Sequence, residues 1–130
     1  MKIIKSNYES YKTRVNNENL ESPLAKNIES GNVSYFEILN DDNTYLDNFE
    51  VFDNDNNWLV IDVHNKNSII DNKELMNLIL SELKKYYSSL ILRIDKEFKD
   101  RIDNSKLYGF EEKSVKNQGN YNYVELKIEL

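Results

Sequence analysis

The sequence predicts one α/β domain over residues 1–130, built on a mixed central sheet, and three features indicate this class. Two short apolar runs, residues 58–64 and 90–95, are rich in branched aliphatic side chains, as strands buried on both faces are. The segment between them, residues 71–86, repeats apolar side chains at helical spacing. Residues 121–130 alternate apolar and charged side chains, which is typical of a half-buried strand. A chain of 130 residues is long enough for one ordinary hydrophobic core.

The first part of the chain predicts an edge strand and two helices. Residues 1–6 alternate weakly, and residues 8–19 carry apolar side chains at helical spacing before a run of asparagines. The second helix has clearer ends, because Ser22 supplies a capping hydroxyl, Pro23 suits the first helical position and Gly31 suits the end.

An antiparallel meander is predicted next. Its strands are residues 33–39, 45–52 and 58–64, and the polar turns between them are residues 40–43 and 53–57. Asparagine takes the place of glycine in these turns, which is physically reasonable because it tolerates a left-handed backbone better than other residues with a side chain.

The helix predicted over residues 71–86 connects two strands as a crossover. Asp71 is expected to cap its first turn, with Glu74 three residues later completing a capping box. A strand, a helix and a strand in this order form a right-handed unit with parallel strands. Since ligands of such sheets bind at the carboxyl ends of the strands, a site is expected near His64 and Asp95.

The C-terminal part predicts a short helix over residues 96–107, which ends before Gly109, and a hairpin of residues 112–116 and 121–130. The complete order is β-α-α-β-β-β-α-β-α-β-β. The sequence therefore predicts a mixed sheet with an antiparallel meander, a parallel βαβ crossover and a C-terminal hairpin.

Composition narrows the possible partners. A net charge of -6 and a pI near 4.9 argue against nucleic acid, whose binding requires clustered Lys and Arg, and favour a small amine or a basic protein. Without cysteine, and with a single histidine, metal chemistry has little support. We expect a cytoplasmic protein without a membrane partner, because no stretch has the apolar length of a signal peptide or a bilayer span.

Several residues are candidates for chemistry. Histidine side chains titrate near neutral pH, so His64, the only histidine, is a candidate to accept an amine proton, and Asp62 or Asp95 are alternatives that act through a water molecule. The plainer interpretation of all three is a solvated position at a strand end. Four tyrosines are candidates for a recognition surface or for the rim of the core, namely Tyr86, Tyr87, Tyr121 and Tyr123.

The order of elements resembles the GNAT superfamily of acyl-CoA-dependent N-acetyltransferases. Residues 107–112, Leu-Tyr-Gly-Phe-Glu-Glu, are similar to the end of the family's last helix, and residues 123–130 are similar to its final strand. This resemblance implies that acetyl-CoA lies where the two parallel strands separate. It also implies a hydroxyl that protonates the departing thiolate, which is Tyr108 or Ser105 depending on the alignment.

In that family a glycine-rich loop before the crossover helix holds the cofactor's pyrophosphate, and here the corresponding loop is residues 65–72. The residues that the resemblance places at the cofactor are Val63, Asn65, Lys66, Asn67, Asn72 and Lys73. Ile70 and Asn72 stand where the family has glycines, and a carboxylate at Asp71 would compete with the pyrophosphate for backbone amides.

Two functions follow from the resemblance and its departure. The first is a divergent acetyltransferase that moves an acetyl group from acetyl-CoA to a primary amine of a basic acceptor. The alternative is a catalytically inactive, acidic interaction module, of the inhibitor or immunity type, that binds a basic protein.

Overall fold

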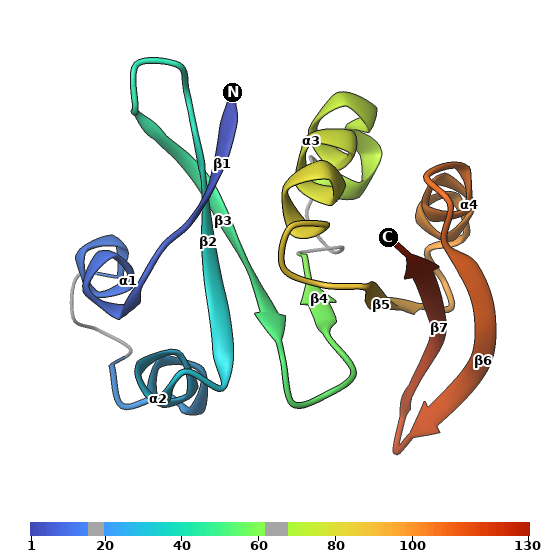
Figure 1. The fold of residues 1–130 in the computed structure, drawn as a ribbon. Coiled ribbons are helices and arrows are strands. Elements are labelled where there is room, and N and C mark those ends of the chain that lie inside the picture. Colours follow the sequence, from blue (N-terminus) through green and yellow to red (C-terminus); the bar gives the residue numbers. More distant parts are fainter. Residues whose placement is uncertain (16–19, 62–67) are drawn as a thin grey trace. The chain divides into compact units, whose positions relative to one another are not determined.

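The structure is a computed structural model that describes residues 1–15, 20–61 and 68–130. The chain divides into two compact units, Met1–Asn56 (unit 1) and Asn57–Leu130 (unit 2), which are described separately. Helices and strands follow each other in the predicted order, with one added 3₁₀ helix (Figure 1). The mixed α/β class is therefore confirmed, whereas a single domain over residues 1–130 stays a prediction.

Unit 1 is a three-stranded antiparallel sheet with two helices on one side (Figure 1). Strand β2 lies between β1 and β3, with Tyr35 opposite Glu50 and Phe36 opposite Phe49. The elements are β1 (Lys2–Lys5), α1 (Tyr8–Arg14), α2 (Pro23–Ser30), β2 (Val33–Leu39) and β3 (Tyr45–Phe52).

The helices of unit 1 pack on the sheet through a small apolar cluster. Its buried members are Tyr11, Ala25, Ile28, Val33 and Tyr35. The rings of Tyr11 and Tyr35 meet edge to face at 5.4 Å between centroids, which is a favourable aromatic arrangement. This cluster holds α1 and α2 against β2.

The ends of α2 form as predicted. The Ser22 hydroxyl accepts a hydrogen bond from the Ala25 amide at 3.1 Å, Pro23 stands at the first helical position, and Gly31 closes the helix with a φ of 86°. The predicted role of asparagine in turns is also confirmed, because Asn43, with a φ of 71°, has a left-handed backbone in the β2–β3 turn.

Unit 2 contains the predicted βαβ crossover. Strands β4 and β5 are parallel, with Trp58 opposite Ile91, and β5 and β6 flank β7 in antiparallel pairing. Its elements are β4 (Trp58–Val60), the 3₁₀ helix η1 (Ile69–Asp71), α3 (Lys73–Leu83), β5 (Ser89–Asp95), α4 (Lys99–Leu107), β6 (Glu111–Gln118) and β7 (Tyr121–Glu129).

The C-terminal hairpin is longer than predicted, because β6 extends to Gln118, which pairs with Tyr121. Only Gly119 and Asn120 remain in the turn, and a φ of 64° at Gly119 is one that a two-residue hairpin needs. Strand β7 has the predicted alternation, with Val124 and Leu126 buried on one face. Helix α4 begins at Lys99, three residues later than predicted.

Candidate functional site

The predicted site at the carboxyl ends of β4 and β5 falls largely on residues that the structure does not describe. The predicted bases Asp62 and His64 lie outside the described residues, and so do four predicted cofactor contacts, Val63, Asn65, Lys66 and Asn67. Their roles stay predictions. The described part of the site consists of the segment before α3, the face of α4 beside it, and the end of β5.

The segment before α3 forms a tight turn, η1, whose amides bond within the chain. The Ser68 hydroxyl accepts from the Ile70 amide at 3.3 Å, and the Ser68 carbonyl accepts from the Asp71 amide at 3.1 Å. The Asn72 amide donates to the Ile69 carbonyl at 3.0 Å. Ile70 is fully buried, so its side chain is part of the core. Three consecutive amides of this turn therefore have intramolecular acceptors.

Asn72, and not Asp71, caps helix α3. The Asn72 side-chain oxygen accepts from the Leu75 amide at 3.0 Å, so the predicted cap at Asp71 is wrong by one residue. The reason is η1, which includes Asp71 in its own turn and directs its carboxylate elsewhere. Asn72 and Lys73 are both predicted cofactor residues. In the structure, Asn72 is the cap of α3 and Lys73 is its first residue.

The Asp71 carboxylate binds two side chains of α4. One oxygen accepts from Asn104 Nδ2 at 3.0 Å and the other from Arg101 Nε at 3.3 Å. The Arg101 side chain is only 12% exposed, and its guanidinium lies 5.1 Å from the centre of the Phe98 ring. Beside this contact lies a hollow of about 370 Å³, which we call the Asp71 hollow and which is lined by Asp71 and residues 97–101.

Tyr108, the predicted thiolate acid, holds the same turn from the end of α4. Its hydroxyl donates to the Ile70 carbonyl at 2.5 Å, and burial raises its pKa, with the charge of Asp71 as a further cause. Ser105, the alternative in the other alignment, is fully buried and donates to the Arg101 carbonyl at 2.8 Å. Each of the two hydroxyls therefore has a backbone acceptor within the chain.

Replacing Tyr108 with phenylalanine is expected to destabilise unit 2 by about 1 kcal/mol, the usual net contribution of one hydrogen bond. The ring stays and only the bond to Ile70 is lost, so urea denaturation measures that bond. The matched control is Tyr121→Phe at a tyrosine of β7 that is 39% exposed, for which no comparable loss is expected. Equal midpoints for the two variants would contradict this role of Tyr108.

The carboxyl end of β5 carries a second hollow. About 320 Å³ in volume, it is lined by Asp95, Lys96, Glu97, Lys99, Asn120 and Asn122. Asp95 lies at the strand end as predicted, and one of its oxygens accepts from the Glu97 amide at 2.9 Å. Burial raises the pKa of Tyr121, and the charge of Asp95 raises it further. Two acidic and two basic side chains make this hollow balanced in charge.

The predicted tyrosines lie in two separate groups. The rings of Tyr86 and Tyr87, just after α3, are 6.4 Å apart, and those of Tyr121 and Tyr123, on β7, are 5.4 Å apart. Tyr86 is 45% exposed and Tyr121 39% exposed, so each group offers one ring to solvent.

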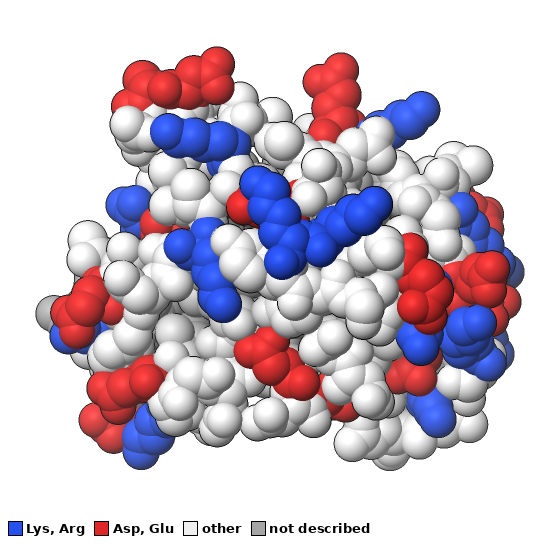
Figure 2. All heavy atoms as spheres, viewed as in Figure 1, with Lys and Arg blue, Asp and Glu red and all other residues white. Residues whose placement is uncertain are grey.

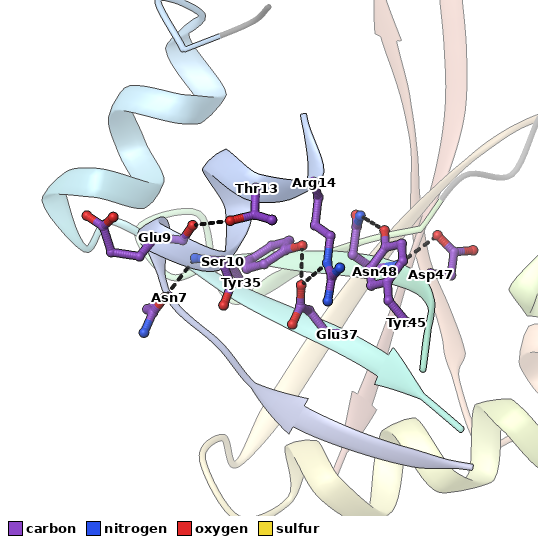
Figure 3. A network of polar contacts seen from close by, with 10 residues as sticks. All are labelled: Asn7, Glu9, Ser10, Thr13, Arg14, Tyr35, Glu37, Tyr45, Asp47 and Asn48. Carbon is purple, nitrogen blue, oxygen red and sulfur yellow. Dashed lines mark hydrogen bonds and ion pairs between the residues drawn. The ribbon is translucent and has the colours of Figure 1, made fainter. Parts of the chain in front are cut away.

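Unit 1 contains a polar network that sequence reasoning missed (Figure 3). The buried carboxylate of Glu37 accepts from Arg14 Nε and from the Tyr35 hydroxyl, both at 3.0 Å. The Arg14 guanidinium lies 4.1 Å from the centre of the Tyr45 ring, whose hydroxyl accepts from Asn48. A glutamate inside the apolar run of residues 33–39 is the signal that could have pointed to it.

The acidic excess of the chain belongs entirely to unit 1. Residues 1–56 have 11 Asp and Glu against 5 Lys and Arg, whereas residues 57–130 have 12 against 12. In unit 2, acidic and basic side chains alternate over β6 and β7 (Figure 2), as in the pairs Lys113–Glu111 at 3.2 Å and Lys127–Glu129 at 3.2 Å.

The described residues contain neither a cluster of metal-ligand side chains nor a helix that could span a membrane. Within residues 1–15, 20–61 and 68–130, no three His, Cys, Asp or Glu side chains are placed to hold a metal ion. The helices of that part of the chain are also too short or too polar to cross a bilayer.

Comparison with known proteins shows which fold this is. The sequence matches no protein-family model and no curated protein. Solved structures, in contrast, match nearly the whole chain. An N-acetyltransferase from Staphylococcus aureus Mu50 has 14% identity and a TM-score of 0.66, and the match covers 98% of this chain and 96% of that one. A spermidine/spermine N-acetyltransferase from Vibrio cholerae has 11% identity and a TM-score of 0.66, with 98% and 93% covered.

A third neighbour, a GNAT family acetyltransferase from Elizabethkingia anophelis with acetyl-CoA bound, has 14% identity and a TM-score of 0.54. That match covers 85% of this chain and 84% of the other. This chain has the GNAT fold. The predicted resemblance is thereby confirmed for the fold, together with its divergence in sequence.

The described part of this GNAT fold does not fit the pyrophosphate of acetyl-CoA. A diphosphate at the start of a helix needs backbone amides that face solvent. Here the amides of Ile70, Asp71, Asn72 and Leu75 have acceptors within the chain. The Asp71 carboxylate lies beside the same turn and is itself bound by Arg101 and Asn104 of α4.

Proposed function

We propose that this GNAT-fold chain is an acidic interaction module, of the inhibitor or immunity type, that binds a basic protein partner. The observation that carries the proposal is the hydrogen bonding of residues 68–75. The turn that the fold offers to a cofactor is bonded within the chain and carries Asp71 next to Asn72. Within the described residues 68–75, amides that could otherwise face a diphosphate are bonded within the chain.

The class of partner follows from the charge of unit 1. Glu21 and Asp41 are 94% and 93% exposed, and they belong to the unit that holds the whole acidic excess. A surface of one sign attracts a partner of the opposite sign and speeds the encounter at low salt. A basic protein is therefore expected to bind unit 1.

Calorimetric titration with CoA and acetyl-CoA tests the cofactor side of the proposal. At about 1 mM ligand, no heat beyond dilution is expected. The expected dissociation constant is above about 1 mM, which corresponds to less than about 4 kcal/mol of binding free energy. A dissociation constant in the micromolar range would overturn the proposal.

The partner side is tested with two variants of equal charge change. Glu21→Lys with Glu29→Lys alters unit 1, and Asp103→Lys with Glu129→Lys alters unit 2 by the same amount. The binding partner for this test is a protein that copurifies with the chain in a fixed ratio. The unit 1 variant is expected to associate with it at least about tenfold more slowly than the unaltered chain does. The unit 2 variant is expected to associate at nearly the unaltered rate. Equal losses for both variants would argue against binding through unit 1.

A second candidate is acetyl transfer from acetyl-CoA to a primary amine. The neighbours described above favour it, since all three are acetyltransferases and one has acetyl-CoA bound. Incubation of the chain with acetyl-CoA and spermidine, the amine named for the Vibrio neighbour, tests it by mass spectrometry. Acetylated product above the uncatalysed background, lost in His64→Ala, would establish this function in place of the first.

A further inference from the structure

The contact between Asp71 and α4 has the chemistry of a bound oxyanion. Two donors on separate side chains, Arg101 Nε and Asn104 Nδ2, each bond a different oxygen of the same carboxylate. Paired donors of this kind are how proteins hold carboxylate and phosphate groups, which present two oxygens at similar spacing. Here the anion is a side chain of the chain itself.

Arg101 has contacts besides the one with Asp71. Arg101 is 12% exposed, and its guanidinium lies over the Phe98 ring. Its backbone carbonyl also accepts from the buried Ser105 hydroxyl at 2.8 Å, within the regular turns of α4. Asp71, in contrast, reaches these donors with a side chain that is 39% exposed and adjoins the Asp71 hollow. Space for a small ligand therefore lies directly beside the carboxylate.

We propose that Arg101 and Asn104 form a subsite for a small oxyanion, a carboxylate or a phosphate, which the chain fills with its own Asp71. Asp71 thereby fastens η1 to α4, and the Tyr108 bond to Ile70 reinforces the same junction. The proposal concerns two elements of unit 2 and does not depend on the partner or on the cofactor. Glu97 and Asp100 also line the hollow, so the affinity for a free anion is expected to be in the millimolar range.

The decisive experiment is rescue of an Asp71→Ala variant by free anions. Loss of the carboxylate beside a largely buried guanidinium is expected to lower the melting temperature by about 5 °C. Sodium acetate or phosphate at about 50 mM is expected to restore at least half of this loss, relative to sodium chloride of equal ionic strength. The unaltered chain should show no such difference between the salts, because Asp71 fills the subsite.

Two further variants separate a specific subsite from a general salt effect. Asp103→Ala removes an exposed acidic residue of the same helix and is expected to show no anion rescue. Asp71→Ala combined with Asn104→Leu removes one donor and is expected to lose the rescue. If acetate and phosphate stabilise Asp71→Ala no more than chloride does, the subsite is not formed and the proposal is overturned.

If Asp71→Ala does not fold, the unaltered chain still tests the contact by NMR. The side-chain amide signals of Asn104 are expected to shift as Asp71 is protonated on acid titration, because Nδ2 donates to that carboxylate. The exposed amide of Asn117, on β6 opposite Asn122, serves as the reference, because it is not among the residues that line the hollow of Asp95. Asn104 signals that follow those of Asn117 throughout the titration would contradict the contact.

Discussion

Replacing Glu37 with alanine is expected to destabilise the protein by about 3–5 kcal/mol, the range for breaking a buried ion pair from one side. The Glu37 carboxylate is the acceptor for both Arg14 and Tyr35. Tyr35 is 1% exposed, so its hydroxyl loses its acceptor in a place that water scarcely reaches. Arg14, the last residue of α1, loses the ion pair that joins the helix to β2.

Urea denaturation of Glu37→Ala beside Glu111→Ala measures this effect. Glu111 is also a strand glutamate, but its side chain is 77% exposed, so its removal should change stability by less than about 0.5 kcal/mol. A double-mutant cycle with Tyr35→Phe separates the contribution of the Tyr35 hydroxyl from that of Arg14. The bond between Tyr35 and Glu37 is missing in both single variants, so their effects on stability should not add. Coincident midpoints for Glu37→Ala and Glu111→Ala would show that the network contributes nothing to stability.

Replacing Glu50 with glutamine is expected to remove a pH dependence of stability between pH 4.5 and pH 7. Burial raises the pKa of Glu50 from 4.5 to about 7, and the charge of Asp47 contributes to the shift. The folded protein thus binds this proton more tightly than the unfolded chain. The stabilisation is complete below pH 4.5 and is lost as the pH rises to about 7.

The size of the effect follows from the shift, since each pKa unit corresponds to about 1.4 kcal/mol, so that the whole change is about 3 kcal/mol. The measurement is urea denaturation of Glu50→Gln and of the unaltered chain across this pH range. The quantity compared is the difference between their free energies of unfolding at each pH. Asp47→Asn is the control, because removal of the neighbouring charge lowers the folded pKa of Glu50 and should move the upper end of the slope to a lower pH without abolishing it. A constant difference between Glu50→Gln and the unaltered chain would show that Glu50 does not titrate in this range.

The raised pKa of Glu50 and the network of Glu37 share one origin in the β2–β3 pairing. Tyr35 and Glu37 project from one face of β2, and Glu50 lies directly opposite Tyr35 on β3. Glu37 is bound by Arg14 and Tyr35. Burial raises the pKa of Tyr11 and of Tyr35, and the charge of Glu50 raises both further. Glu37 has an arginine and a hydroxyl as partners, and its neighbour Glu50 has the charge of Asp47 near it. The two glutamates differ in behaviour because they differ in partners.

Local sequence patterns predicted the ends of helices correctly where one residue type determines the backbone conformation at that position. Ser22, Pro23 and Gly31 mark α2 because a cap, a fixed φ and a left-handed end are properties of one residue each. The cap of α3 is a case in which local patterns predicted the wrong residue, Asp71 in place of Asn72. A capping box at Asp71 is as good in sequence as a cap at Asn72, and the choice depends on Arg101 and Asn104, about 30 residues further along the chain.

The candidate site was predictable only in part for the same reason. The absence of glycine at Ile70 and Asn72 already indicated a departure from a diphosphate loop, because a side chain at either position hinders contact with the backbone. That the amides of this turn are bonded within the chain follows from its 3₁₀ geometry, which no pattern of residues 65–72 indicates.

By itself, the sequence determined the order of helices and strands, the parallel crossover between β4 and β5, and the acidity of residues 1–56, because periodicity, caps and charge are properties of neighbouring residues. Only the tertiary structure decided that Asp71 binds α4, that Tyr108 holds Ile70, and that Glu37 binds Arg14 and Tyr35. These contacts join residues far apart in the chain, and their free energy depends on burial and partners that exist only once the chain has folded.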